Sequence, residues 1–157
     1  MIIMEGNLLK TPFQIIAHQT NCLGIMGGGV ALAIKNTYPN VYEEYKSFCD
    51  IHGIEECFGS SCVVGEKEKI IINAFGQKYI GSNECMTDYA ALKSGLSEGI
   101  KTIRLCWNLD SITQLTIAIP YKIGCGLAGG DWEEVSKLLE EIEVEQNVVF
   151  IAYNIGK

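Results

Sequence analysis

The sequence is short of positive charge. Twelve Lys and Arg residues stand against 19 Asp and Glu residues, so the formal net charge is −7 at pH 7. Nonspecific binding to DNA or RNA requires a basic face, and this balance therefore argues against that class of protein. An anionic small ligand remains compatible with it, because backbone amides can bind phosphate without lysines.

Long apolar runs and paired cysteines are also missing. No apolar run approaches about 20 residues, so we expect no membrane-spanning segment. The first residues, Met1 to Glu5, contain no basic n-region, which argues against a secretory signal. The seven cysteines include no CxxC pair. We therefore expect no disulfide framework and no metal site, but mostly small buried side chains in a reducing cytoplasm.

Segments of strand and helix character alternate through most of the chain. The predicted strands are residues 1–4, 13–18, 61–65, 69–75, 115–119 and 148–153. The predicted helices are about 29–36, 41–49, 88–101 and 131–143, with Thr87 and Asp131 as N-caps, His52 in a polar turn and 102–105 as a connection or short strand. This order is typical of an α/β domain with a mostly parallel sheet. Without a linker or repeat, we expect a single domain over residues 1–157.

The first unusual segment is a glycine-rich turn between the strand at 13–18 and the helix that follows it. Four glycines fall within the six residues Gly24 to Gly29. Glycine lets a ligand touch the backbone, and a helix N-terminus presents free amides to an anion. The turn is therefore interpreted either as a phosphate or diphosphate cradle, or as a tight strand-to-helix connection without a ligand.

A second glycine-rich loop, Pro120 to Gly130, follows the strand at 115–119 and leads into the helix that Asp131 opens. Ligands of open α/β sheets bind beyond the carboxyl ends of the strands. Two such loops at one edge of the sheet predict a single cleft for a phosphate-bearing ligand.

Two segments in this order resemble the macro domain family: Asn21 to Ala31 and, downstream, Ile119–Pro120 with Ile123 to Leu127. The similarity spans nearly the whole chain. It is closest to the branch containing the ADP-ribose-1''-phosphate phosphatases, the terminal ADP-ribose hydrolases and the antitoxins that reverse DNA ADP-ribosylation. The resemblance implies one macro domain over residues 1–157, a three-layer α/β/α sandwich with a central mixed, mostly parallel sheet, and no cofactor.

The resemblance also implies that ADP-ribose lies across the strand ends. The residues that it places around the ligand are Asn7, Leu8, Asn21, Gly27, Gly28, Gly29, Val30, Ile123, Gly124, Cys125, Gly126, Leu127, Tyr153 and Asn154. The first loop would face one side of the diphosphate and distal ribose, and the second would close over the other side.

Several of these residues have a structural interpretation beside the ligand one. Asn21 suits the ribose diol, but it is also a turn-stabilising residue. Asn7 stands where many macro domains carry an adenine-contacting aspartate, or it simply forms a turn. Tyr153 is placed near the adenosine or at the edge of the core. Cys125 follows Gly124 in the second loop, where a helix N-terminus could lower its pKa, but no base partner is visible.

Two residues are candidates for catalysis, His18 and Asp131. A histidine at the strand end could act as general base or orient a water, and the phosphatase-like branch resembles this chain in having a histidine close to this point. The alternative is a buried, hydrogen-bonded histidine. Asp131 is the nearest carboxylate to the second loop, and helix capping explains it equally well. The lysine and aspartate of de-ADP-ribosylating relatives correspond here to Gln77, beside Lys78, and to Ala128.

Two functions follow. The first is a hydrolase of an ADP-ribose derivative. ADP-ribose-1''-phosphate is preferred over ADP-ribosylated macromolecules as substrate, because the lysine–aspartate pair is incomplete. The alternative is a non-catalytic reader that binds ADP-ribose or ADP-ribosylated macromolecules.

Overall fold

The computed structural model describes residues 1–81 and 83–155. It contains a six-stranded sheet with the order β1-β6-β5-β2-β4-β3. The strands in this order are β1 (Ile2–Glu5), β6 (Val148–Asn154), β5 (Leu115–Pro120), β2 (Ile15–Gln19), β4 (Lys69–Ala74) and β3 (Ser61–Glu66). Neighbouring strands are parallel except for the β3–β4 hairpin, which is antiparallel. The carboxyl ends of β1, β6, β5, β2 and β4 therefore lie along one edge.

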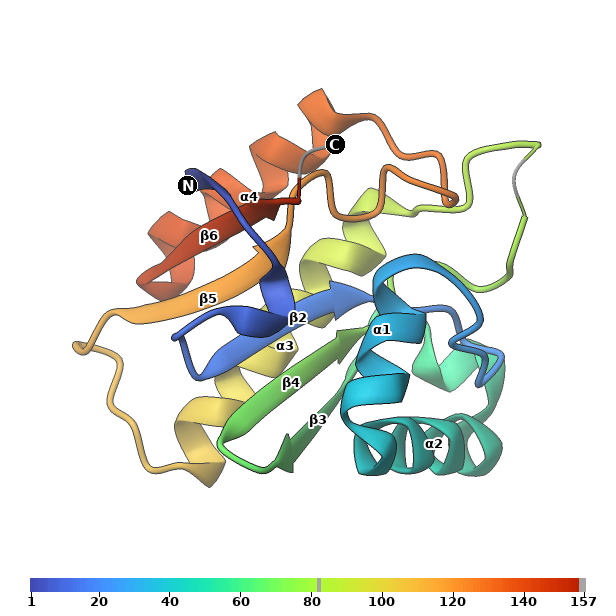
Figure 1. Cartoon of the computed structure of the whole chain (residues 1–157), viewed down its shortest axis with the longest axis horizontal. Helices are drawn as coiled ribbons and strands as arrows, with labels where there is room; N and C mark the ends of the chain where they lie inside the picture. Colours follow the sequence, from blue (N-terminus) through green and yellow to red (C-terminus); the bar gives the residue numbers. More distant parts are fainter. Residues whose placement is uncertain (82, 156–157) are drawn as a thin grey trace.

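Helices cover both faces of the sheet. Figure 1 shows α1 (Gly29–Thr37) and α2 (Pro39–Cys57) in front of the sheet, with α3 (Tyr89–Cys106) and α4 (Trp132–Gln146) behind it. A short 3₁₀ helix, η1 (Leu8–Lys10), follows β1. The two cores match this division, since one collects side chains of α3 and α4 and the other those of α1 and α2. The expected three-layer α/β/α sandwich with a mixed, mostly parallel sheet is thus confirmed.

The strand predictions are confirmed for all six strands, with small shifts of their ends. β2 is buried along four of its five residues, as its unbroken apolar run indicates. None of the helices in the described part of the chain has the length and apolar character that crossing a membrane requires. Four of the seven cysteines are buried: Cys22, Cys49, Cys57 and Cys62.

Three local predictions are wrong. Residues 102–105 continue α3 instead of forming a connection, because Ile103 keeps the helical spacing of the buried face. The N-cap of α3 is Asp88, whose carboxylate accepts from the Ala91 amide at 2.9 Å, and not Thr87. His52 lies within α2, where Nδ1 is 2.8 Å from a carboxylate oxygen of Glu56.

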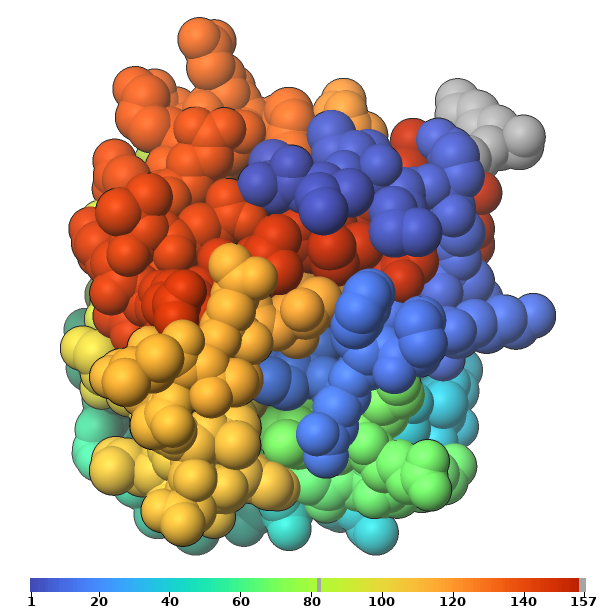
Figure 2. All heavy atoms as spheres, turned by 90° about the vertical axis from the view of Figure 1, so that its left-hand side faces the viewer, coloured from blue at the N-terminus to red at the C-terminus, as the bar shows by residue number. Residues whose placement is uncertain are grey.

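The edge of the sheet opposite the carboxyl ends is covered by connecting segments. Figure 2 shows the segment between α3 and β5, the residues before β2 and the β3–β4 turn beside one another on this side of the molecule. They leave only a small hollow of about 260 Å³. The larger cleft lies at the other edge.

Candidate functional site

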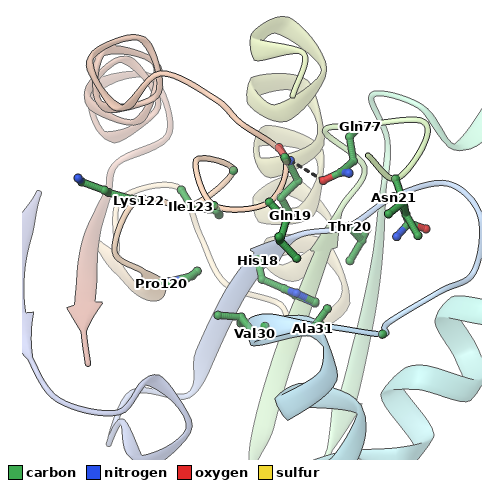
Figure 3. A pocket seen from close by; sticks show the side chains of 18 of the residues that line it. His18, Gln19, Thr20, Asn21, Val30, Ala31, Gln77, Pro120, Lys122 and Ile123 are labelled. Atoms are coloured by element: carbon green, nitrogen blue, oxygen red, sulfur yellow. Dashed lines mark hydrogen bonds between the residues drawn. The ribbon is translucent and has the colours of Figure 1, made fainter. Parts of the chain in front are cut away.

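A cleft of about 630 Å³ lies at the carboxyl ends of β2 and β5 (Figure 3). Three segments line it: the end of β2 with the first glycine-rich loop, the residues after β4, and the second glycine-rich loop. The lining residues are His18, Gln19, Thr20, Asn21, Ile25, Gly27, Gly28, Gly29, Val30, Ala31, Gln77, Ile80, Gly81, Pro120, Tyr121, Lys122, Ile123, Gly124, Gly126, Leu127 and Ala128. The two loops therefore face one cavity, at the edge where parallel α/β sheets bind ligands.

The first loop presents unused backbone amides to this cleft. Among the described residues, the amides of Gly27 and Gly28 donate no hydrogen bond. Gly28 is the N-cap of α1 and Gly29 its first residue, and no side chain caps this end. Since the first amides of a helix lack intrahelical partners and carry its positive dipole end, this arrangement suits an anionic group.

Glycine is needed for different reasons along the two loops. Gly29 and Gly124 have φ values of 55° and 75°, a conformation that side chains disfavour. Gly28 is extended, with φ of −155°, and a Cβ there would lie 3.6 Å from Cδ1 of Leu127. A Cβ at Gly28 would therefore make an ordinary contact with the second loop, whereas a larger side chain would extend into the cleft that Gly28 lines.

His18 lies at the floor of the cleft and is almost fully buried, with 1% of its surface exposed. Its Nε2 is 2.6 Å from Oδ1 of Asn73, while Nδ1 is buried without a partner in the described part of the chain. Burial lowers the pKa of His18 to about 4, although the hydrogen bond with Asn73 opposes this shift. The imidazole is therefore neutral at physiological pH and keeps one unused acceptor.

Gln19 directs its amide to the other side of β2, into a network that the sequence did not reveal. Its Nε2 donates to Oε1 of Gln77 at 2.8 Å and to the Thr87 hydroxyl at 2.9 Å (Figure 3 shows the first bond). The Thr87 hydroxyl donates in turn to the carbonyl of Gly124 at 2.6 Å. The network ties the end of β2 to the second loop. In the sequence, the one indication of this network was that a polar residue, Gln19, stands next to His18 at the end of a predicted strand.

The side chain of Asn21 holds the first loop together. Its Oδ1 accepts from the Leu23 amide and the Tyr45 hydroxyl, each at 2.9 Å, and its Nδ2 donates to the Ile25 carbonyl at 2.8 Å. Asn21 also lines the cleft. In this structure its amide therefore has the turn-stabilising role that was the alternative to ribose binding.

The residues predicted around adenosine do not line the 630 Å³ cleft. They lie at the carboxyl ends of β1 and β6: Asn7, Leu8, Tyr153 and Asn154. Asn7 caps η1 by accepting from the Leu9 amide at 2.9 Å, and Leu8 is buried in the core. The Tyr153 hydroxyl accepts a hydrogen bond from Thr11 at 2.9 Å. The same edge of the sheet thus continues past the cleft, with its polar atoms held in local contacts.

Cys125 and Asp131 belong to the second loop and its exit, and neither lines the cleft. Burial raises the pKa of the Cys125 thiol to about 11, so it is not the activated thiolate that a helix N-terminus could have produced. Asp131 is exposed and accepts from the Glu133 amide at 2.9 Å as the N-cap of α4. The structure gives both residues local roles.

The lysine–aspartate pair of the related hydrolases has no equivalent in the cleft. Lys78 turns outward and contacts the carboxylate of Glu55 at 3.1 Å, while Gln77 and Ala128 line the cavity. Lys122 is the cationic side chain among the described lining residues. No group of three or more His, Cys, Asp or Glu side chains within the described ranges could hold a metal ion.

Comparison with known proteins agrees with this geometry. A model of the macro domain matches residues 17–139, which include both glycine-rich loops. The chain is 30% identical over 139 residues to a DNA ADP-ribosyl glycohydrolase of Mycobacterium tuberculosis, covering 86% of this chain but only 36% of that protein. It is 27% identical over 172 residues to an ADP-ribose 1''-phosphate phosphatase of Scheffersomyces stipitis, covering 94% and 98% of the two chains.

A solved structure shows the same fold. The macrodomain of Mycobacterium tuberculosis DarG superposes with a TM-score of 0.74 at 27% identity, and 97% of each chain is covered. The Thermosipho africanus DarTG structure in complex with ADP-ribose gives a TM-score of 0.76 at 20% identity, covering 96% of this chain and 40% of that one. The family model, the sequence relatives and the fold agree, and the chain belongs to the macro domain family.

Proposed function

We propose that this macro domain binds ADP-ribose in the 630 Å³ cleft and hydrolyses an ADP-ribose derivative, with ADP-ribose-1''-phosphate preferred over ADP-ribosylated macromolecules. The diphosphate would lie against the free amides of Gly27 and Gly28, and the second loop would cover it. The adenosine would extend along the sheet edge toward Asn7 and Tyr153. Relatives named as a phosphatase and as a glycohydrolase support this choice of ligand.

One observation carries the catalytic part of the proposal: a neutral histidine with an unpartnered Nδ1 at the floor of the cleft. A water would attack the phosphorus, and His18 would take its proton. The bond between phosphorus and the O1'' oxygen would break, that oxygen would take a proton from solvent, and ADP-ribose and inorganic phosphate would leave while His18 returns its proton to solvent. The loop amides would stabilise the developing negative charge. The outward Lys78 and the Ala128 side chain favour the phosphate ester over macromolecular adducts.

A phosphate-release assay on the purified protein tests the reaction. The His18→Ala variant is expected to lose about 10²–10⁴-fold in rate while ADP-ribose binding changes much less. The matched control is His52→Ala, because His52 lies within α2 on Glu56 and away from the cleft. Equal turnover by His18→Ala and the wild type would remove His18 from the mechanism.

Binding is tested separately by calorimetry with ADP-ribose. Gly28→Val is expected to weaken binding by at least about tenfold, because its side chain would enter the cleft near Leu127, and to leave folding intact since Gly28 is extended. The control is Gly65→Ala, a glycine of the strand β3 that lies outside the cleft and where a Cβ would make only ordinary contacts. Wild-type binding by a folded Gly28→Val protein would overturn this position of the ligand.

A non-catalytic reader is the second candidate, and one observation favours it. Nδ1 of His18 is buried, so a water reaches it only if the surrounding residues leave room. A reader would bind ADP-ribose in the calorimeter and release no phosphate from ADP-ribose-1''-phosphate. That pair of results would select the reader over the hydrolase.

A further inference from the structure

Asn73 of β4 is the neighbour that contacts His18 directly. The two residues are paired in the parallel register of β2 and β4, so their side chains point to the same face of the sheet. Asn73 is fully buried, with 0% of its surface exposed. Its Oδ1 lies 2.6 Å from Nε2 of His18, and its Nδ2 donates to the backbone carbonyl of Cys62 at 2.9 Å.

The second of these contacts determines the orientation of the amide. The Cys62 carbonyl on β3 can only accept a hydrogen bond, so the amide group that faces it is the NH₂ of Asn73. Turning the amide over would place two acceptor oxygens against each other in the core, and a buried unpaired acceptor is costly. The backbone of β3 thus fixes which end of the Asn73 amide faces His18.

The orientation of Asn73 determines where His18 carries its hydrogen. Since Oδ1 only accepts, Nε2 of His18 must be the donor, and the neutral ring then has its lone pair on Nδ1. Figure 3 shows the His18 ring on the side of β2 where Val30 and Ala31 line the cleft. Among the described residues, Asn73 is the one hydrogen-bond partner of the ring, since Nδ1 has none, so the tautomer depends on this contact.

We propose that Asn73 is a positioning residue that holds His18, a residue lining the cleft, in the Nε2–H tautomer and thereby leaves Nδ1 as the acceptor of the ring. The catalytic consequence rests on the proposed hydrolase function, whereas the tautomer does not. Removal of Asn73 affects the position of a hydrogen, in addition to any effect on packing. This distinguishes it from a residue that only fills space in the core.

The tautomer is measured directly by ¹⁵N NMR of the imidazole. The chain has two histidines, so the His52→Ala variant leaves His18 as the one signal. We expect a hydrogen on Nε2 and a bare Nδ1 at neutral pH. In Asn73→Leu, which matches the shape without the polar atoms, the Nε2–H signal should give way to a mixture or to Nδ1–H. In Asn73→Asp, which keeps an acceptor toward Nε2 but loses the donor to the Cys62 carbonyl, the hydrogen should stay on Nε2.

A wild-type spectrum with the hydrogen on Nδ1 would overturn the proposal. So would an unchanged tautomer in Asn73→Leu, or loss of the Nε2–H signal in Asn73→Asp. If neither variant of Asn73 folds, the wild-type spectrum still decides, because a hydrogen on Nδ1 in the wild type would overturn the proposal.

Activity gives the second readout. Asn73→Leu is expected to lower kcat by about 10–100-fold at unchanged KM, the usual size of effects from a residue behind the reacting group, with partial recovery in Asn73→Asp. A wild type with the expected tautomer and no phosphate release would reject the hydrolase function and support the positioning role. If Asn73→Leu changed the tautomer of His18 but kept the wild-type kcat, the catalytic consequence would be rejected.

Discussion

The end of β2 places a polar side chain on each face of the sheet, His18 on one and Gln19 on the other. The two differ in the residues to which their hydrogen bonds connect them. His18 and Gln19 are consecutive, point to opposite faces of the sheet, and each leaves one buried acceptor without a partner in the described part of the chain. On the side of α1 and α2, Nε2 of His18 lies 2.6 Å from the acceptor oxygen Oδ1 of Asn73. On the side of α3, Gln19 connects Gln77 and Thr87.

This difference teaches how one strand end can serve two purposes. The His18 side is a strand-to-strand contact in the core, which suits the positioning role proposed for Asn73. The Gln19 side joins loops, and through Thr87 it reaches the carbonyl of Gly124, suited to setting the position of the second loop. Three variants that act on one side at a time test this division.

The largest effect is expected on the His18 side, in the pH dependence of the free energy of unfolding. The pKa of His18 is lowered to about 4 in the folded protein from an ordinary value of 6.5. The unfolded chain then binds the extra proton between these values, so stability is full above pH 6.5 and falls as the pH drops toward 4. The loss approaches about 3 kcal/mol below pH 4.

Urea unfolding of wild type and His18→Gln between pH 7 and pH 4.5 measures this loss. The variant lacks the titrating group, so its stability should fall less steeply with acid. His52→Ala, on an exposed contact with Glu56, is the matched control for the loss of a histidine away from the cleft. Identical slopes for His18→Gln and wild type would show that the imidazole is not buried as described.

The next effect is expected on the Gln19 side. A Cβ at Gly76 would overlap Oε1 of Gln19 and lie 3.0 Å from Cβ of Leu92. Gly76→Ala should therefore destabilise the protein by about 1–3 kcal/mol, as overpacking usually does. In a Gln19→Ala background the same substitution should cost less, because the main obstacle is gone. Purely additive costs in this double-mutant cycle would contradict the close contact between the two residues.

The smallest effect is expected for Thr87→Val, which removes one hydroxyl from the network. The bond to the Gly124 carbonyl and the acceptor for Gln19 are lost together, at about 1 kcal/mol of stability. Thr87→Ser keeps the hydroxyl and should resemble wild type in thermal unfolding. The ¹⁵N signals of His18 should not move in either variant. A shift in them would show that the two sides of β2 are coupled.

The sequence was sufficient for the strands, the layers and the two glycine-rich loops, because each depends on local patterns. Buried parallel strands are unbroken apolar runs, and glycines at strand ends mark where the backbone approaches a ligand. The end of α3 was missed because Thr102 and Ile103 are β-branched and locally favour a strand, although residues 102–105 contain no helix breaker and Ile103 falls on the buried face of the helix.

The contacts between side chains around the cleft could not be predicted from local sequence patterns. The Gln19 network joins three segments that are far apart in the chain, and only the packed fold brings Thr87 to Gly124. Likewise, Asn73 looked like an ordinary residue at the end of a hairpin strand. Its role depends on the parallel register that sets it beside His18 and on the carbonyl of Cys62 behind it.

The pairing of β1 with β6 has a consequence for the order in which the chain assembles. Ile2 is opposite Ile151 in this ladder, so within the described part of the chain β1 pairs with β6 alone, the strand farthest from it in the sequence. Closing so long a stretch of chain costs entropy before the pairing returns any stability, and such contacts form slowly. The residues of β1 can therefore pair in the sheet only after β6 has been synthesised. The amino-terminal ammonium then binds the carboxylate of Glu143 on α4 at 2.8 Å.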